Sequence, residues 1–253
     1  MSIEKQANFL LLPYIRDNHE ILIEEAKLKD YTFKQFLEEL LQGEVDQRRN
    51  NSLKKRINKA HFPYRMELSD FKTDHLSVEL KTKIRQLESL DFIKNKENII
   101  LVGNPGTGKT SLSICLGMKA CKEYKNVLFI SVPLLMMEIA EAMSNSQILQ
   151  YKKRFEKYDL VILDELGYCS FSKEAGELLF NLLSSRNEVG SIVITSNLTI
   201  DNWNDVFKDK ILTGAIVDRL TNKAHLIDMS GESYRIRQTK KWMEEQNGNK
   251  SLQ

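Results

Sequence analysis

Hydrophobic residues recur at two different periods along this chain, and the change of period divides it into two regimes. From about Ile3 to Ala60 the apolar positions follow a helical spacing, and Thr32 with Gln35 forms a capping-box start for the clearest helix. The apolar residues of that helix are Phe33, Phe36, Leu37, Leu40 and Leu41. Gly43 predicts the end of this helix, because glycine is common just past a helix C-terminus.

The second regime alternates short β-rich runs with helical stretches. The runs predicted as strands cover residues 98–103, 126–130, 159–163, 191–196 and 225–229. Strands separated by helices form a mainly parallel sheet with both faces covered. The pattern therefore predicts an α/β domain built on a five-stranded, mainly parallel sheet, preceded by a small all-helical domain.

A strongly basic segment lies where the two regimes meet. Residues 48–65 contain no Asp or Glu and include Arg48, Arg49, Lys54, Lys55, Arg56, Lys59 and Arg65. Pro63 ends any helix in this segment, because proline has no backbone N–H and restricts the residue before it. We therefore place the domain boundary between about Phe62 and Leu68, with a helical domain in residues 1–65 and an α/β domain in residues 66–253.

Composition excludes several classes of protein. The chain has 253 residues, of which 42% are hydrophobic and 28% charged, and this is typical of a globular rather than a disordered or fibrous protein. Its longest apolar runs have about five or six residues, far fewer than the roughly 20 that cross a bilayer. The first residues lack the apolar stretch of a secretory signal. We therefore expect no membrane association and a cytoplasmic location.

The cysteines and the net charge add little about function. Cys115, Cys121 and Cys169 have no metal-ligand spacing, so we expect reduced thiols packed as small apolar side chains. The net charge of +2, from 37 Lys and Arg against 35 Asp and Glu, predicts no partner by itself.

A glycine-rich loop directly follows the first predicted strand. It matches the pattern G-x-x-x-x-G-K-[ST] and, with the residue after it, comprises Gly103, Asn104, Pro105, Gly106, Thr107, Gly108, Lys109, Thr110 and Ser111. Backbone N–H groups of such a loop surround phosphates, Lys109 reaches the outer phosphates, and Thr110 offers its hydroxyl to Mg²⁺. The alternative is a glycine-rich turn with an exposed lysine. The position of the loop between a strand and a helix favours a nucleotide site that takes ATP and Mg²⁺.

Two carboxylates follow the third predicted strand. Asp164 and Glu165 come directly after four apolar residues, which is the arrangement of a Walker B motif. We expect Asp164 to act at Mg²⁺ and Glu165 to activate the attacking water as a general base. Asn197 follows the fourth strand, where its amide is predicted to orient that water or contact the γ-phosphate; an isolated asparagine is otherwise a common turn former.

These motifs together resemble the IstB family of insertion-sequence transposition helper ATPases, within the AAA+ group that includes the DnaA and DnaC initiators and loaders. The resemblance spans about residues 15–240 and also includes the segments 31–41, 61–63, 196–207, 218–220 and 231–235. It implies an AAA+ P-loop fold in which Asn197 is sensor 1 and Arg235 is sensor 2. Only 18 of the 253 residues follow Arg235, which implies a reduced or absent C-terminal lid.

The resemblance also implies a role for Arg219 as an arginine finger that acts on the ATP of a neighbouring subunit. Such a finger is typically worth about 10³ to 10⁵ in rate, so hydrolysis would depend on assembly of a homo-oligomer. Without the resemblance, both Arg219 and Arg235 are most simply solvated charges or members of surface ion pairs.

Double-stranded DNA and a cognate transposase are the other partners that the resemblance implies. The basic side chains predicted to contact DNA are Arg48, Arg49, Lys54, Lys55, Arg56 and Lys59, with a smaller group of Lys152, Lys153 and Arg154. Lys and Arg neutralise phosphates without reading bases, so binding should depend weakly on sequence and strongly on salt. The alternative is that these charge runs are solvated helix faces.

We expect an ATP-dependent helper that self-assembles on double-stranded target DNA and recruits and stimulates its transposase, with hydrolysis driving disassembly. One alternative is a DnaC-like replicative helicase loader, which binds single strands. No cysteine precedes Cys115, which argues against loaders with an N-terminal zinc module but not against zinc-free loaders. Another alternative is a nucleotide-gated switch with negligible hydrolysis, against which Glu165 argues.

Overall fold

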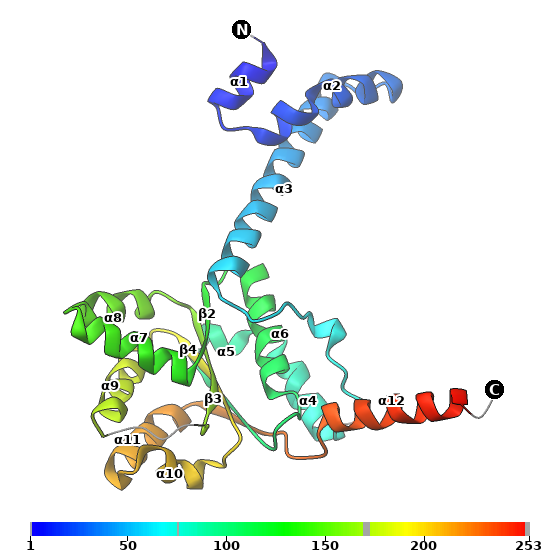
Figure 1. Cartoon of the computed structure of the whole chain (residues 1–253). Helices are drawn as coiled ribbons and strands as arrows, with labels where there is room; N and C mark the ends of the chain where they lie inside the picture. The colour runs from blue at the N-terminus through cyan, green and yellow to red at the C-terminus, as the bar shows by residue number, and fades with distance from the viewer. Residues whose placement is uncertain (1, 75, 169–172, 251–253) are drawn as a thin grey trace. The chain divides into compact units, whose positions relative to one another are not determined.

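The computed structural model describes residues 2–250 except 75 and 169–172, and the described chain forms two compact units (Figure 1). The units comprise Met1–Lys55 and Arg56–Gln253. The division lies ahead of the boundary predicted at residues 62–68, because the residues just after Lys55 pack on the second unit. Arg56 Nε donates to the carbonyl of Cys121 at 2.9 Å, and the carbonyl of Ala60 accepts from the Phe129 N–H at 2.8 Å.

The N-terminal unit is helical, as the spacing of its apolar residues predicts. It contains α1 (Ile3–Phe9), α2 (Pro13–Leu28) and most of α3 (Phe33–Lys59). The predicted helix end at Gly43 is wrong, because α3 continues through this residue. A side chain at Gly43 would collide with the ring of Tyr14 on α2, so this glycine permits close packing of two helices rather than ending one.

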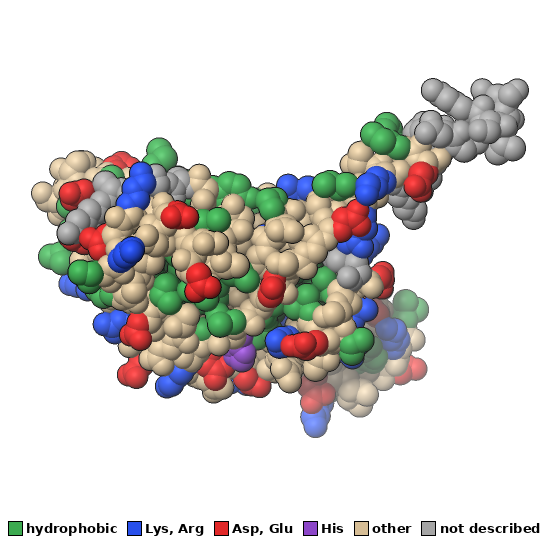
Figure 2. Space-filling view, turned by 90° about the horizontal axis from the view of Figure 1, so that it is seen from below, with side chains coloured by type: hydrophobic (Ala, Val, Ile, Leu, Met, Phe, Trp, Pro, Cys, Tyr) green, Lys and Arg blue, Asp and Glu red, His purple; other side chains and the backbone are tan. Residues whose placement is uncertain are grey.

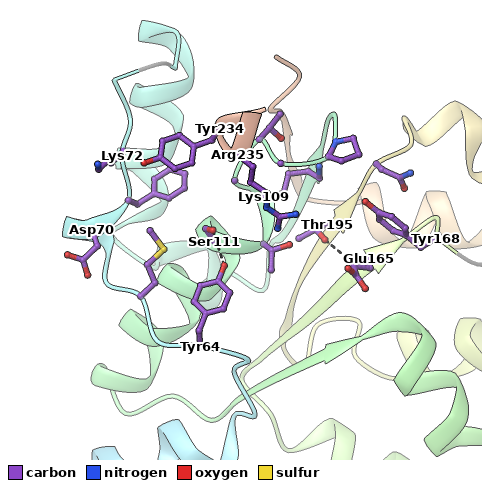
Figure 3. Close-up of a pocket in the computed structure, with 18 residues that line it drawn as sticks. Tyr64, Asp70, Lys72, Lys109, Ser111, Glu165, Tyr168, Thr195, Tyr234 and Arg235 are labelled. Carbon is purple, nitrogen blue, oxygen red and sulfur yellow. Dashed lines mark hydrogen bonds between the residues drawn. The ribbon is translucent and has the colours of Figure 1, made fainter. Parts of the chain in front are cut away.

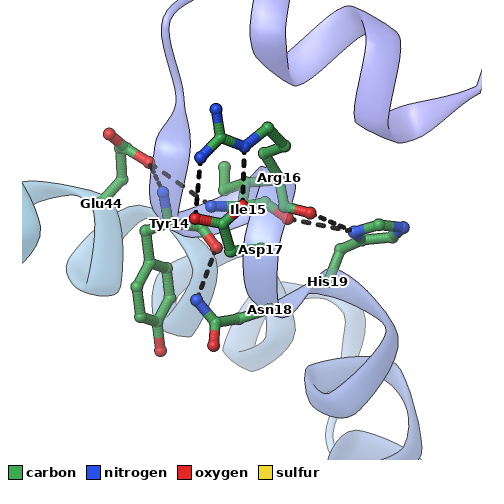
Figure 4. Close-up of polar contacts among 7 residues, drawn as sticks. All are labelled: Tyr14, Ile15, Arg16, Asp17, Asn18, His19 and Glu44. Carbon is green, nitrogen blue, oxygen red and sulfur yellow. Dashed lines mark hydrogen bonds and ion pairs between the residues drawn. The ribbon is translucent and has the colours of Figure 1, made fainter.

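A buried carboxylate from α3 caps the N-terminus of α2 (Figure 4). The N-cap residue of α2, Leu12, has no side chain that can accept the first N–H groups. Glu44 Oε2 accepts from the N–H of Tyr14 at 2.9 Å and from that of Ile15 at 3.5 Å. The negative charge also lies at the positive end of the helix dipole. Glu44 therefore supplies from a distant position the cap that the sequence before α2 lacks.

The second unit contains the predicted five-stranded parallel sheet, and this prediction is confirmed. The strands are β1 (Asn98–Val102), β2 (Val127–Ser131), β3 (Leu160–Leu166), β4 (Ser191–Ser196) and β5 (Ala224–Asp228). Their order in the sheet is β2-β3-β4-β1-β5, with parallel pairing throughout. β1 and β4 are therefore central, and both are buried on their two faces, which explains their nearly continuous apolar sequences.

Helices cover both faces of this sheet (Figure 1). The helices of the second unit are α4 (Val78–Leu87), α5 (Asp91–Lys94), α6 (Lys109–Lys122), α7 (Val132–Ser144), α8 (Ile148–Glu156), α9 (Lys173–Ser184), α10 (Asn204–Phe207), α11 (Lys210–Thr221) and α12 (Tyr234–Lys250). Short 3₁₀ helices occur at Leu68–Asp70 and Ile200–Trp203. Alternate residues of β3 separate the two layers: Val161 and Leu163 pack in the cluster that includes α7 and α9, whereas Ile162 lies against Gly117 of α6.

Two of the cysteines lie on α6 as buried free thiols, as expected. Cys115 donates to the carbonyl of Glu67, and burial raises the pKa of Cys115 to about 12 and that of Cys121 to about 11. Both thiols are therefore protonated packing residues. Cys169 lies outside the described residues. Among the helices that the structure describes, none combines the length and apolar character that a membrane crossing requires.

Candidate nucleotide-binding site

The glycine-rich loop connects the end of central strand β1 to the start of α6. Gly103, Gly106 and Gly108 all have positive φ, and Gly108 is the N-cap residue of α6. A Cβ at Gly103 would lie 2.6 Å from the backbone of Met229, just past β5, so only glycine fits between the two strand ends. The loop therefore brings its backbone to a helix N-terminus, where unpaired N–H groups and the helix dipole favour an anion.

Lys109 is the first residue of α6, and its ammonium group is held by the loop. Nζ donates to the carbonyls of Gly103 at 2.7 Å and Asn104 at 2.8 Å, and the residue is only 8% exposed. Burial lowers the pKa of Lys109, and the nearby carboxylate of Asp164 partly offsets this effect. The structure thus concentrates positive charge within the loop, as the motif predicts.

Asp164 lies within hydrogen-bonding distance of two threonines from different elements. Its Oδ1 accepts from Thr110 Oγ1 at 2.9 Å and from Thr195 Oγ1 at 2.6 Å. Asp164 is buried, with 6% of its surface exposed. The Thr110 hydroxyl and the Asp164 carboxylate are the hard oxygen donors that Mg²⁺ prefers, so this pair fits the predicted ion. Thr195 was missed by sequence reasoning, since it is an ordinary β-branched residue of a strand.

Glu165 lines the same pocket as the loop and Lys109 (Figure 3), and Asn197 is another of its lining residues. Glu165 is exposed to the pocket, although Asp164 beside it is buried. The Oδ1 atom of Asn197 is buried and, within the described part of the chain, has no hydrogen-bond partner. This oxygen lies against Gly167, where a Cβ would come within 2.6 Å of it. The structure therefore brings together the two residues for which the sequence predicted roles at the attacking water.

A segment before the sheet forms another wall of the pocket. The residues that it contributes are Tyr64, Met66, Asp70, Phe71 and Lys72. The hydroxyls of Tyr64 and Ser111 are 2.9 Å apart, which connects this wall to α6. Sequence reasoning missed the wall because no motif marks it. The only local signal is a pair of aromatic residues shortly after Pro63, and that signal is weak.

Arg235 lies in the pocket, near the N-terminus of α12 (Figure 3). The N–H of Tyr234 donates to the carbonyl of Gly106 at 2.9 Å, and Asn104 Nδ2 donates to the carbonyl of Gly231 at 3.4 Å. These two bonds attach the start of α12 directly to the glycine-rich loop. The N-terminus of α12 therefore lies on the loop, and this places Arg235, the second residue of the helix, in the pocket.

Arg219 lies elsewhere in the unit. It is in the last turn of α11, with its guanidinium 6.0 Å from the centre of the Phe180 ring. It borders a separate small cavity with Lys96 and Asn98, at the amino end of β1, whereas the glycine-rich loop follows the carboxyl end of that strand. The structure therefore does not bring Arg219 to the pocket of its own chain.

Several of the predicted DNA contacts have partners within the protein. Arg56 donates to Cys121 and lies 4.6 Å from the centre of the Tyr124 ring, so it is part of the fold of the second unit. Arg48 donates to Glu44 and to the carbonyl of Leu11. Weaker pairs are Arg49 with Asp46 at 3.7 Å and Arg154 with Glu138 at 3.6 Å.

The remaining predicted DNA contacts are more open. Lys54, Lys55, Lys59 and Lys153 are exposed, and Lys152 is half-buried. On the face seen in Figure 2, in contrast, Lys and Arg side chains lie interspersed with Asp and Glu. The exposed lysines of α3 are therefore the best candidates for a surface that meets a polyanion.

Comparisons with known families and curated proteins agree on one relationship. The family described as IstB-like ATP binding protein matches residues 5–242. The chain is 33% identical over 233 residues to the insertion sequence IS21 ATP-binding protein of Pseudomonas aeruginosa, an alignment that covers 92% of this chain and 88% of that protein. It is 31% identical over 245 residues to the corresponding IS5376 protein of Geobacillus stearothermophilus, covering 96% and 97% of the two chains.

Solved structures agree with the fold. The chain resembles the crystal structure of DnaI with a TM-score of 0.54 and 22% identity, over 67% of this chain and 90% of that one. It resembles AMPPCP-bound DnaA from Aquifex aeolicus with a TM-score of 0.57 and 17% identity, over 67% and 51% of the two chains. At such low identity these likenesses concern the fold alone, and they confirm the expected AAA+ P-loop architecture.

Proposed function

Because the chain belongs to the family of IstB-like ATP-binding proteins, we propose that it is an ATPase that assembles on double-stranded target DNA and assists transposition. The observation that carries the proposal is the convergence of Lys109, Glu165 and Arg235 in one pocket beside the glycine-rich loop. Phosphate-binding, water-activating and charge-stabilising groups in one pocket are what phosphoryl transfer requires.

Each side chain has a distinct part in the proposed hydrolysis. The loop N–H groups and Lys109 hold the phosphates, while the oxygens of Thr110 and Asp164 hold Mg²⁺. The ion supplies positive charge that offsets the charge developing on the transferred phosphate. Glu165 accepts a proton from the attacking water, and Asn197, which lines the same pocket, orients this water. Arg235 stabilises the phosphate charge from the first turn of α12.

The proposed site is completed by a second copy of the chain. Arg219 lies outside the pocket of its own chain, which supports a role on the ATP of a neighbouring subunit. ATP then joins subunits, and hydrolysis weakens the contact that its phosphates provide. An arginine supplied in this way accelerates hydrolysis by about 10³ to 10⁵. The rate of ATP hydrolysis therefore increases when subunits assemble.

The proposed DNA-binding surface includes the exposed lysines of α3, above all Lys54 and Lys55. The structure describes no ion pair for either of them, whereas Arg48 and Arg56 have partners within the fold. Lys152, Lys153 and Arg154 on α8 form a second proposed contact, of which Arg154 is already paired with Glu138. Lysine contacts to phosphates favour duplex binding with little sequence preference and strong salt dependence.

A transposase is the proposed protein partner. The relatives are named as ATP-binding proteins of insertion sequences, which supports a role beside the enzyme that cuts and joins the element. The N-terminal unit exposes large apolar side chains, including Phe9, Leu28 and Phe33, and these are available for contact with the transposase or with another copy.

The decisive experiment is sedimentation velocity of the full chain with labelled duplex or labelled single-stranded DNA, with and without a slowly hydrolysed ATP analogue. We expect a large assembly that requires both duplex and nucleotide, and Lys109→Ala, which weakens nucleotide binding, is the matched control. Assembly confined to single strands would indicate a helicase loader instead. Nucleotide-dependent assembly without measurable hydrolysis in the wild type would indicate a switch.

A further inference from the structure

The pairing of β3 with β4 is irregular at the two carboxylates of the site. Leu163 pairs with Ile194, but the next pair is Leu166 with Ser196, so β3 has one more residue than β4 across this interval. Asp164 and Glu165 therefore both lie opposite Thr195. This is a β-bulge, a device that occurs next to active sites and redirects side chains.

The bulge has a clear chemical consequence. Consecutive residues of a regular strand point to opposite faces of the sheet, which would separate Asp164 from Glu165. Glu165 instead has a φ of +67°, a left-handed conformation that is costly for a residue with a side chain. With this kink, Asp164 contacts Thr110 while Glu165 lines the pocket, so both carboxylates reach one site.

Side chains of β4 replace the regular hydrogen bonds that the bulge removes. Thr195 Oγ1 accepts from the N–H of Glu165 at 3.0 Å (Figure 3). The same hydroxyl donates to Asp164 Oδ1 at 2.6 Å. Ser196 Oγ donates to the carbonyl of Leu166 at 2.7 Å. Thr195 is only 2% exposed, so water cannot take over its two bonds without opening the strands.

We propose that Thr195 is a positioning residue for ATP hydrolysis. Its hydroxyl holds the kinked backbone of Glu165 and the carboxylate of Asp164 at fixed positions relative to each other. This inference rests on the proposed ATPase function. Thr195 lines the pocket, and it acts through the two acidic residues that its hydroxyl contacts. The effect on hydrolysis depends on the Thr195 hydroxyl and not on the size of the side chain. This hydroxyl accepts the hydrogen bond from the Glu165 N–H and donates its own proton to Asp164.

The test measures ATP hydrolysis by the full chain with Mg²⁺ and duplex DNA. Thr195→Val keeps the shape and removes the hydroxyl, and we expect kcat to fall about 100-fold while KM changes by less than about threefold, because a displaced base loses rate without losing substrate binding. Thr195→Ser keeps the hydroxyl and should remain within about threefold of the wild type. Thr213→Val, which removes another buried and hydrogen-bonded hydroxyl, is the matched control and should retain wild-type kcat.

A double variant separates positioning from general destabilisation. If Thr195 acts through the two carboxylates, Thr195→Val should slow the Glu165→Gln enzyme by much less than the roughly 100-fold that it slows the wild type. Multiplicative losses, a slow Thr195→Ser, or an unchanged Thr195→Val would each overturn the inference. If thermal melting shows that Thr195→Val does not fold, Thr195→Ala replaces it in the same comparisons.

Hydrogen exchange at the Glu165 amide supplies a readout that does not depend on turnover. We expect this N–H to be protected in the wild type and in Thr195→Ser, and to exchange faster in Thr195→Val. Equal protection in Thr195→Val would overturn the inference. A wild type that hydrolyses no more ATP than Lys109→Ala would contradict the proposed function, and the exchange measurement would still decide whether Thr195 holds the bulge.

Discussion

The two units of this chain differ in how many of their apolar side chains they bury. In the second unit the central strands β1 and β4 are almost completely buried, and the pocket residues are fixed by contacts from several elements. In the N-terminal unit the buried apolar residues among those described are Ala7 and Leu22. Its exposed large apolar residues are Ile3, Phe9, Leu10, Leu11, Ile21, Leu28, Phe33, Leu37, Leu41 and Val45.

This difference teaches what each unit can do alone. A packed unit holds side chains at fixed positions, as binding of a small ligand requires. A unit with so little buried apolar surface gains little free energy from its own folding, and its exposed apolar residues favour contact with another molecule. We therefore assign the proposed ATP hydrolysis to the second unit, and assembly and partner contacts to the N-terminal unit.

The largest expected effect tests whether one chain alone contains all the residues needed for ATP hydrolysis. Replacing Arg219 with alanine should reduce DNA-stimulated ATP hydrolysis by about 10³ to 10⁵ when the arginine serves a neighbouring site. ATP binding to the isolated chain should be unchanged, because Arg219 lies outside its own pocket. Steady-state turnover and nucleotide titration check this, and unchanged turnover would mean that one chain suffices. Mixing Arg219→Ala with Glu165→Gln chains should restore activity at mixed interfaces.

The next effect concerns the chemistry inside the pocket. Glu165→Gln keeps the shape of the side chain and removes the base, so turnover should fall by about 10² to 10⁴. Nucleotide-dependent assembly on duplex DNA should persist and last longer, since the joining nucleotide is not consumed. Single-turnover hydrolysis and sedimentation measure the two properties. Turnover equal to that of the wild type would remove Glu165 from the mechanism.

Paired core substitutions test the difference in packing between the units directly. Leu101→Ala leaves a cavity in central strand β1 and should lower the free energy of unfolding by about 2 to 5 kcal/mol. Leu37→Ala on α3, where the leucine is 55% exposed, should change it by less than about 0.5 kcal/mol. Urea unfolding of both variants measures these differences. A large loss for Leu37→Ala would show that its side chain is packed in the protein in solution.

The smallest expected effect concerns the exposed lysines of α3. Changing Lys54 and Lys55 together to glutamate should weaken duplex binding and lower the slope of log affinity against log salt by about two, since each phosphate contact contributes about 0.9. Lys27→Glu with Lys29→Glu, in the same unit but with ion-pair partners, makes the same charge change as a control. Fluorescence anisotropy over a salt series distinguishes them, and equal slopes would exclude Lys54 and Lys55 from the DNA contact.

Local patterns predicted much of the second unit correctly. The five strands and the glycine-rich loop are recognisable because each depends on residues close together in sequence: apolar runs, turn glycines and a lysine at the helix start. The helix end at Gly43 was predicted wrongly because its glycine serves a contact with Tyr14, which lies on another helix. Arg56 resembled its basic neighbours in sequence, but it turns toward Cys121 and Tyr124.

The sequence by itself determined the α/β class, the phosphate loop and the order of the two carboxylates, because these follow from the period of apolar residues and from contiguous motifs. Only the tertiary structure decided that Tyr64 faces Ser111, that Arg235 joins the pocket while Arg219 does not, and that the Thr195 hydroxyl bonds to both Asp164 and Glu165. These contacts depend on strand register and on which elements meet in space. A shift of one residue in β3 changes which side chains face each other, and no local pattern records that shift.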